Sequence, residues 1–177
     1  MDPRLVMRAQ QGDVAAFDAI TQLLYGRFLQ VAYRIVRDRQ RAEDATQQAL
    51  VNIWQKLPRL REAERFDAWS YRVLVNVCYT EAKRHRREPT LASAPELSAH
   101  DEYGRVDDRD QLERAFARLS VEQRAVVVLH HYLGMSIPDI AEVLEIPLGT
   151  ANSRLGRGME RLSTALRAYA EHEFVSY

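Results

Sequence analysis

The chain has 177 residues, of which 46% are hydrophobic, 25 are Lys or Arg, 25 are Asp or Glu, and one, Cys78, is a cysteine. This length fits one ordinary domain or two small ones. A single cysteine excludes a disulfide framework and a four-cysteine zinc site, and it favours a reducing cytoplasm. Neither an apolar run of roughly 18 residues nor a signal-peptide pattern occurs, so we expect a soluble cytoplasmic protein without membrane insertion.

The balanced net charge hides a segregation of charge along the chain. Residues 1–87 hold 16 basic and 10 acidic residues, residues 88–110 hold 2 and 7, and residues 111–177 hold 7 and 8. This distribution predicts two modules, 1–87 and 111–177, joined by an acidic linker at 88–110. The linker has few large apolar side chains to offset the entropy cost of ordering, so we expect it to be flexible.

Apolar residues recur every three or four positions and strict alternation is absent, which predicts an all-α fold. In the first module we expect helices at 14–36, at about 41–57 before Pro58, and at about 66–86. The apolar face of the second helix is expected to hold Ala42, Ala45, Ala49, Ile53, Trp54 and Leu57. On the third, Trp69, Val73 and Val77 form one apolar line, with Leu74 and Cys78 beside it.

The third helix ends in a basic run, Lys83-Arg84-His85-Arg86-Arg87. Such a run alone is usually a solvated face. Here aromatic residues precede it on the same helix, and aromatic faces combined with cations are typical of single-stranded nucleic-acid binding. We expect Trp69 to be partly core and Tyr71 and Asn76 to be the better candidates for base contact. The candidate contacts on this helix are Trp69, Tyr71, Arg72, Asn76, Lys83, Arg84, Arg86 and Arg87.

The second module is expected to begin near Gln111 with a short helix that ends at Ser120. A capping box at 120–123 opens the next helix, which should end at Gly134. A second N-terminal signature at 136–139 opens a short helix to Leu144. The last helix is expected at about 150–169.

Residues 136–157 have the pattern of a helix-turn-helix, with the small residue Ala141 where the two helices would cross. The polar start of the second helix supplies groups that reach base edges and phosphates in a major groove. An ordinary two-helix corner with a polar face is the competing interpretation. Gly156 and Gly158 weaken this helix by about 1 kcal/mol each relative to Ala, which suggests better ordering on DNA. The candidate duplex contacts are Thr150, Asn152, Ser153, Arg154 and Arg157.

No Ser-His-Asp order, glycine-rich phosphate loop or zinc-ligand spacing occurs in the sequence. His130 and His131 are adjacent, and adjacent helix positions do not share a face, so a metal site is not indicated. We therefore expect no catalytic residue, no metal and no cofactor, and a function based on binding.

Together, segments 16–38, 41–57, 66–87 and 114–162 resemble an extracytoplasmic-function (ECF) RNA polymerase sigma factor of the sigma-70 family, the first three matching region 2 and the last region 4. The resemblance implies that Asp44, Gln47 and Gln48 dock on RNA polymerase core. It also implies that 66–87, with the loop 59–65 and its Arg65, captures an unpaired base of the promoter minus-ten element on the non-template strand. The region 4 helix would read the minus-thirty-five element as duplex and touch the polymerase flap.

We therefore predict a promoter-specificity factor that recruits polymerase core, opens DNA and is regulated by an anti-sigma factor. Gln48, Asn152 and Gly156 depart from common family residues, so promoter preference does not transfer. The alternative is a stand-alone helix-turn-helix regulator whose residues 111–177 bind duplex operator as a dimer. That alternative predicts palindromic sites and no need for polymerase. An enzyme with a nucleic-acid-binding tail is disfavoured because no catalytic constellation occurs.

Overall fold

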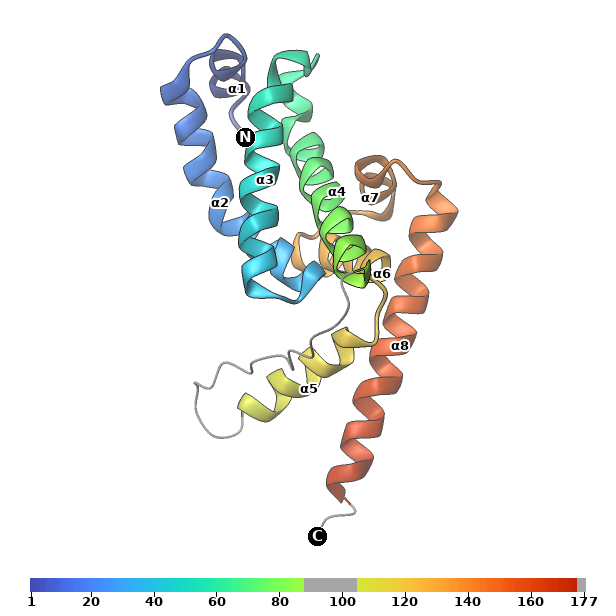
Figure 1. Cartoon of the computed structure of the whole chain (residues 1–177). Helices are drawn as coiled ribbons and strands as arrows, with labels where there is room; N and C mark the ends of the chain where they lie inside the picture. Colours follow the sequence, from blue (N-terminus) through green and yellow to red (C-terminus); the bar gives the residue numbers. More distant parts are fainter. Residues whose placement is uncertain (88–104, 175–177) are drawn as a thin grey trace.

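The computed structural model describes residues 1–87 and 105–174, with the side chains of 1–85 and 110–168. This part of the chain is built of helices alone, as the sequence predicts (Figure 1). In chain order the elements are α1 (Pro3–Gln10), α2 (Val14–Val36), α3 (Arg39–Lys56), η1 (Leu57–Arg59), η2 (Ala63–Arg65), α4 (Phe66–Arg87), α5 (Arg105–Ala117), α6 (Val121–Val127), η3 (Val128–Tyr132), α7 (Ile137–Leu144) and α8 (Leu148–Phe174).

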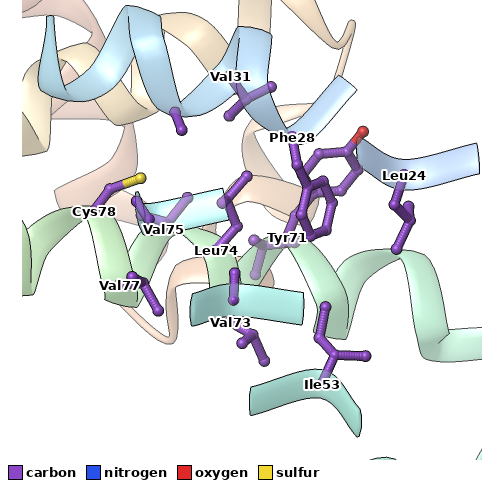
Figure 2. Packing of buried hydrophobic residues seen from close by; sticks show 14 of the residues in the cluster. Leu24, Phe28, Val31, Ile53, Tyr71, Val73, Leu74, Val75, Val77 and Cys78 are labelled. Atoms are coloured by element: carbon purple, nitrogen blue, oxygen red, sulfur yellow. The ribbon is translucent and has the colours of Figure 1, made fainter. Parts of the chain in front are cut away.

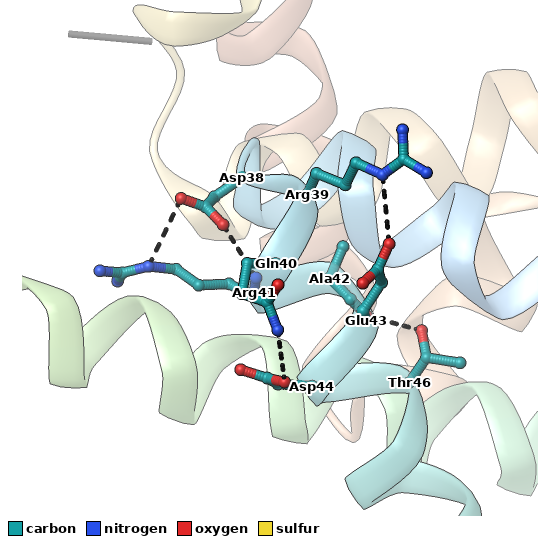
Figure 3. A network of polar contacts seen from close by, with 8 residues as sticks. All are labelled: Asp38, Arg39, Gln40, Arg41, Ala42, Glu43, Asp44 and Thr46. Carbon is teal, nitrogen blue, oxygen red and sulfur yellow. Dashed lines mark hydrogen bonds and ion pairs between the residues drawn. The ribbon is translucent and has the colours of Figure 1, made fainter. Parts of the chain in front are cut away.

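The first domain is a bundle of α1 to α4. Helix α1 was not predicted, although Pro3 stands at its start and Asp2 caps it by accepting a hydrogen bond from the Arg4 amide. Asp38 caps α3 by accepting from the Arg41 amide at 2.8 Å, and ion pairs and amide contacts follow along its first turns (Figure 3). The Asp38 cap, together with Arg37 in the left-handed region at a φ of 62°, explains why α2 and α3 are separate helices with a short corner between them.

The core of this bundle lies between α2, α3 and α4 (Figure 2). The buried face of α4 is centred on Leu74, Val75 and Cys78, which have no exposed surface. Val73 and Val77 lie beside the centre of that face. The centre is therefore shifted by one residue from the predicted line of Trp69, Val73 and Val77. The placement of Trp54 in the core was wrong: its side chain is 38% exposed, because Ile53 takes the core position on α3.

The second domain begins with α5 at Arg105, six residues earlier than the predicted start near Gln111. The predicted capping box at Ser120 is present before α6, and the predicted N-terminal signature at Ser136 before α7 is a second capping box. Helix α6 continues into a π-helical turn, η3, before Gly134 reverses the chain with a positive φ of 70°. The part of the predicted linker at 88–104 lies outside the described residues.

The two domains pack against each other. One cluster of buried apolar residues runs through both, and α4 contacts α6 and α7 while α2 contacts α6 and η3. Polar contacts join the same surfaces: Arg37 pairs with Glu113 at 3.3 Å, and the Arg34 guanidinium lies 4.1 Å above the centre of the Tyr132 ring. None of the helices within 1–87 and 105–174 has an apolar stretch long enough to cross a bilayer.

Candidate functional site

The exposed face of α3 carries the predicted polymerase-binding residues. Asp44, Gln47 and Gln48 are all exposed, because Ala42, Ala45 and Ala49 turn the other face into the core. The Gln40 amide donates to Asp44 at 3.3 Å, and the Gln48 amide donates to Asn52 at 3.0 Å. Contacts four residues apart on one helix hold the polar groups in a fixed row without burying them.

Two apolar residues extend this row and were missed from sequence. Val51 is 47% exposed and Trp54 is 38% exposed, and the Trp54 ring packs on Phe17 with 4.7 Å between ring centres. Both follow Gln47 at helical spacing, so they lie on the same side of α3. The three-residue spacing from Val51 to Trp54 could have indicated that both lie on this side of the helix. Because both side chains are apolar, that spacing did not suggest an exposed surface. We call Asp44, Gln47, Gln48, Val51 and Trp54 the α3 face.

The predicted nucleic-acid residues of α4 divide into exposed and buried sets. Asn76, Lys83 and Arg84 are exposed, and Trp69 is half-buried against Phe66, with 6.0 Å between ring centres. Arg86 and Arg87 belong to the last turn of α4, but their side chains lie outside the described part. An amide and a row of cations on one helix are therefore available to a ligand.

Tyr71 requires a correction. Its side chain is only 7% exposed, and its ring packs against Phe28 with 5.4 Å between ring centres (Figure 2). Burial raises the pKa of the Tyr71 hydroxyl above its ordinary value. The reason is helical geometry: Tyr71 lies three and four residues before Leu74 and Val75, on the buried face of α4. Tyr71 is a core residue in this arrangement and presents no free face for base stacking.

Arg65 and Arg72 are placed beside carboxylates of the other domain. Arg65, in η2, pairs with Glu62 at 2.9 Å and with Glu142 of α7 at 3.2 Å. Arg72, on α4, pairs with Glu145, the residue that ends α7. Two cations predicted to meet DNA are therefore held by acidic groups of the helix-turn-helix.

Helices α7 and α8 have the geometry of a helix-turn-helix. Ser136 accepts a hydrogen bond from the Asp139 amide, α7 ends at Glu145 in the left-handed region with a φ of 51°, and α8 begins at Leu148. Ala151 has no exposed surface, and buried Ile140 and Val143 supply the inner face of α7. A short helix, a left-handed turn and a second helix packed through small residues are what this motif requires.

Only some of the polar side chains at the start of α8 are exposed to solvent. Asn152 and Arg157 are exposed, whereas Thr150, Ser153 and Arg154 are half-buried. The Ser153 hydroxyl donates to the Thr150 carbonyl at 3.1 Å. A guanidinium nitrogen of Arg157 in turn donates to the Ser153 hydroxyl at 3.0 Å.

Arg154 lies close to α4. Burial raises the pKa of Tyr79 on α4 to about 12, and the charge of Arg154 opposes that rise. Arg154 therefore acts electrostatically on Tyr79, a residue of the first domain.

An apolar groove of about 720 Å³ lies between α5, η3 and α8. Leu112 and Met159, which line it, are 45% and 39% exposed. Arg34 of α2 and Arg167 of α8 also line the groove and add positive charge. Apolar walls beside cations suit an amphipathic helix that carries acidic residues.

Comparisons with known proteins match both halves of this arrangement. The family model for sigma-70 region 2 matches residues 21–88, and that for sigma-70 region 4 matches residues 109–162. The chain is 30% identical to the RNA polymerase sigma-H factor of Pseudomonas aeruginosa, over 94% of each chain. It is also 30% identical to the ECF RNA polymerase sigma factor SigM of Mycobacterium tuberculosis, over 93% of this chain and 84% of the relative.

The chain is an ECF RNA polymerase sigma factor. Its fold agrees with that of the sigma factor RpoE in complex with the anti-sigma factor NepR from Bartonella quintana. The TM-score is 0.72, at 24% identity over 87% of this chain and 98% of the other. In this sigma factor, region 2 contains α3 and α4, and region 4 contains the helix-turn-helix of α7 and α8.

Proposed function

We propose that this sigma factor divides its work between three surfaces: the α3 face for polymerase core, the exposed side of α4 for the minus-ten element, and the start of α8 for the minus-thirty-five element. The observation that carries the proposal is that one chain holds a helix-turn-helix together with a separate helix whose polar and basic groups are exposed. We assign 1–87 to the first domain and 111–177 to the second, with α5 beginning within 88–110.

Docking on polymerase core is assigned to the α3 face. Its amides and Asp44 offer directional hydrogen bonds, and Val51 and Trp54 offer apolar area that is already exposed in the free protein. Aromatic residues are enriched at the centres of protein interfaces, surrounded by polar groups. The α3 face has this composition, and all five of its residues lie on one helix.

Promoter opening is assigned to α4. Asn76 offers an amide that can pair with a base edge, while Lys83 and Arg84 offer cations for phosphates. Capture of an unpaired base shifts the duplex equilibrium toward the open state by the free energy of that capture. Opening of this kind needs no bond chemistry, so we assign no catalytic residue and no cofactor.

Recognition of the minus-thirty-five duplex is assigned to Thr150, Asn152, Ser153, Arg154 and Arg157 at the start of α8. The apolar groove beside α8 is assigned to a helix of a protein partner, either the polymerase flap or an anti-sigma factor. A regulator of the second kind is supported by the similar RpoE, which has been solved in complex with an anti-sigma factor.

The test is transcription in vitro with purified polymerase core, this protein and a library of genomic fragments. We expect start sites that share two sequence boxes at a fixed spacing. Asn76→Ala should slow promoter opening, measured by permanganate reactivity of unpaired thymines, more than it weakens core binding. Gln22→Ala, an exposed amide on α2, is the matched control. Binding of palindromic duplex DNA without polymerase would instead favour the stand-alone regulator.

A further inference from the structure

Two glycines leave the backbone uncovered near the start of α8. Gly149 and Gly156 are exposed, and a Cβ atom added at either would meet no atom within 4 Å. Gly156 lies two residues before Gly158, which packs on Val127, so the two glycines point in directions about 200° apart around the helix axis. The outer side of α8 is therefore bare at two points that are about two turns apart.

The bare position at Gly156 brings no packing gain inside the protein. A glycine in the interior of a helix lowers its stability, because glycine loses more backbone entropy on folding than any other residue. At Gly158 the close approach of Val127 uses the missing Cβ atom, but no atom of the described residues uses the one missing at Gly156. The gain that such a glycine offers is a close approach of the backbone to a ligand. On this side of α8, the ligand in the proposed function is duplex DNA.

Asn152 carries an exposed amide one turn before Gly156, on the same side of α8. The neighbouring polar groups are held along the helix, because the Ser153 hydroxyl donates to the Thr150 carbonyl and the Arg157 guanidinium donates to Ser153 at 3.0 Å. The Asn amide is separated from the backbone only by its Cβ atom. It therefore reaches a base edge only where the backbone of the helix itself lies close to the bases.

The chemistry of an amide selects the base. In the major groove adenine presents N7 as an acceptor and its N6 amine as a donor, and these match the two ends of one Asn amide. Guanine presents two acceptors there, which suit a guanidinium. A helix that approaches through Gly156 and reads through Asn152 therefore favours adenine.

We propose that Gly156 brings the backbone of α8 against the edges of the minus-thirty-five bases, so that the short amide of Asn152 pairs with an adenine. Gly156 is then a positioning residue, and Asn152 is the residue that sets the specificity. The inference deepens the proposed function and rests on it, because it takes the start of α8 as the surface that reads the duplex.

The first test identifies the base. Polymerase core carrying this protein selects duplexes from a library that is randomised across the upstream box of a promoter mapped by transcription. We expect one adenine whose replacement weakens wild-type binding by about 5- to 150-fold but hardly changes binding by Asn152→Ala. Replacing this adenine with 7-deazaadenine, which lacks the N7 acceptor, should likewise weaken binding by the wild-type protein and not by Asn152→Ala.

The second test inserts a side chain between α8 and the duplex. Gly156→Leu should weaken binding of the selected duplex by a similar factor and remove the preference for adenine. Thermal unfolding should show an intact free protein, because the space around position 156 is open. Gly26→Leu is the matched control, at an exposed glycine of α2 with equally open surroundings, and should change neither affinity nor preference. Because Asn152→Ala and Gly156→Leu remove the same contact, combining them should weaken binding little more than either alone.

Gly156→Ala separates a close approach from a loosening of the helix. If Gly156 served only to let α8 become ordered on DNA, Ala would order the helix beforehand and tighten binding. A close approach predicts weaker binding instead. The proposal would be overturned by tighter binding of Gly156→Ala, by unchanged binding of Gly156→Leu, or by a base other than adenine at the position that depends on Asn152. Failure of the wild-type protein to direct polymerase to any promoter would contradict the proposed function, so the two failures can be told apart.

Discussion

Gly156 and Gly158 lie two positions apart on α8, yet the structure predicts opposite effects when each is replaced by Ala. A Cβ atom added at Gly156 meets no atom within 4 Å. A Cβ atom added at Gly158 would lie 2.9 Å from Cγ2 of Val127 and 3.7 Å from Cβ of Gln123. Gly158 therefore allows α8 to approach α6 closely, whereas Gly156 serves no packing purpose.

The magnitudes follow from two competing terms. Replacing Gly by Ala inside a helix stabilises it by about 0.8–1.0 kcal/mol. Overpacking a well-packed core costs about 1–3 kcal/mol. Gly156→Ala should therefore raise the free energy of unfolding by about 1 kcal/mol, while Gly158→Ala should leave it unchanged or lower it by up to about 2 kcal/mol. The two variants should differ in Tm by about 2–12 °C.

Thermal unfolding followed by circular dichroism at the helix band measures this difference, and the two variants have the same composition. Val127→Ala removes the atom that the new methyl group would strike, so in that background Gly158→Ala should become stabilising. If Gly158→Ala stabilised the wild-type protein as much as Gly156→Ala does, the close approach of α8 to α6 would be refuted.

Three other substitutions have defined outcomes. Burial raises the pKa of the Cys78 thiol from 9.0 to about 12. Because the thiol of the unfolded chain ionises first, the free energy of unfolding should fall by about 1.4 kcal/mol per pH unit between these two values. In urea unfolding measured across this pH range, Cys78→Ala should lose less of its free energy of unfolding than the wild-type protein. Val51→Ser should weaken core binding by about 5- to 20-fold in a competition assay, whereas Leu23→Ser should not, although Leu23 on α2 is 61% exposed against 47% for Val51. Arg154→Ala should weaken duplex minus-thirty-five binding by about 1–3 kcal/mol, and unchanged anisotropy would remove Arg154 from the reading surface.

Local signals in the chain were sufficient for most of the helices, although α5 begins six residues before its predicted start. The Ser120 and Ser136 capping boxes each span four residues, and the spacing of apolar residues predicts the buried face of each long helix. Both features can therefore be predicted without tertiary contacts. The helix-turn-helix could also be predicted from local sequence, because its turn and its polar second helix are contiguous in the chain. Helix α1 was missed although Asp2 and Pro3 form a local start signal of the same kind as the one before α7.

Properties that depend on distant residues could not be predicted in this way. The contacts of two aromatic rings with another helix are of this kind: Tyr71 packs on Phe28 and is buried, whereas Trp54 packs on Phe17 and remains 38% exposed. Gly158 seemed from sequence to weaken α8, but Val127 makes it a packing requirement. The ion pairs of Arg65 and Arg72 join residues more than 70 positions apart, and no local pattern encodes a contact that forms only when two separately folded surfaces meet.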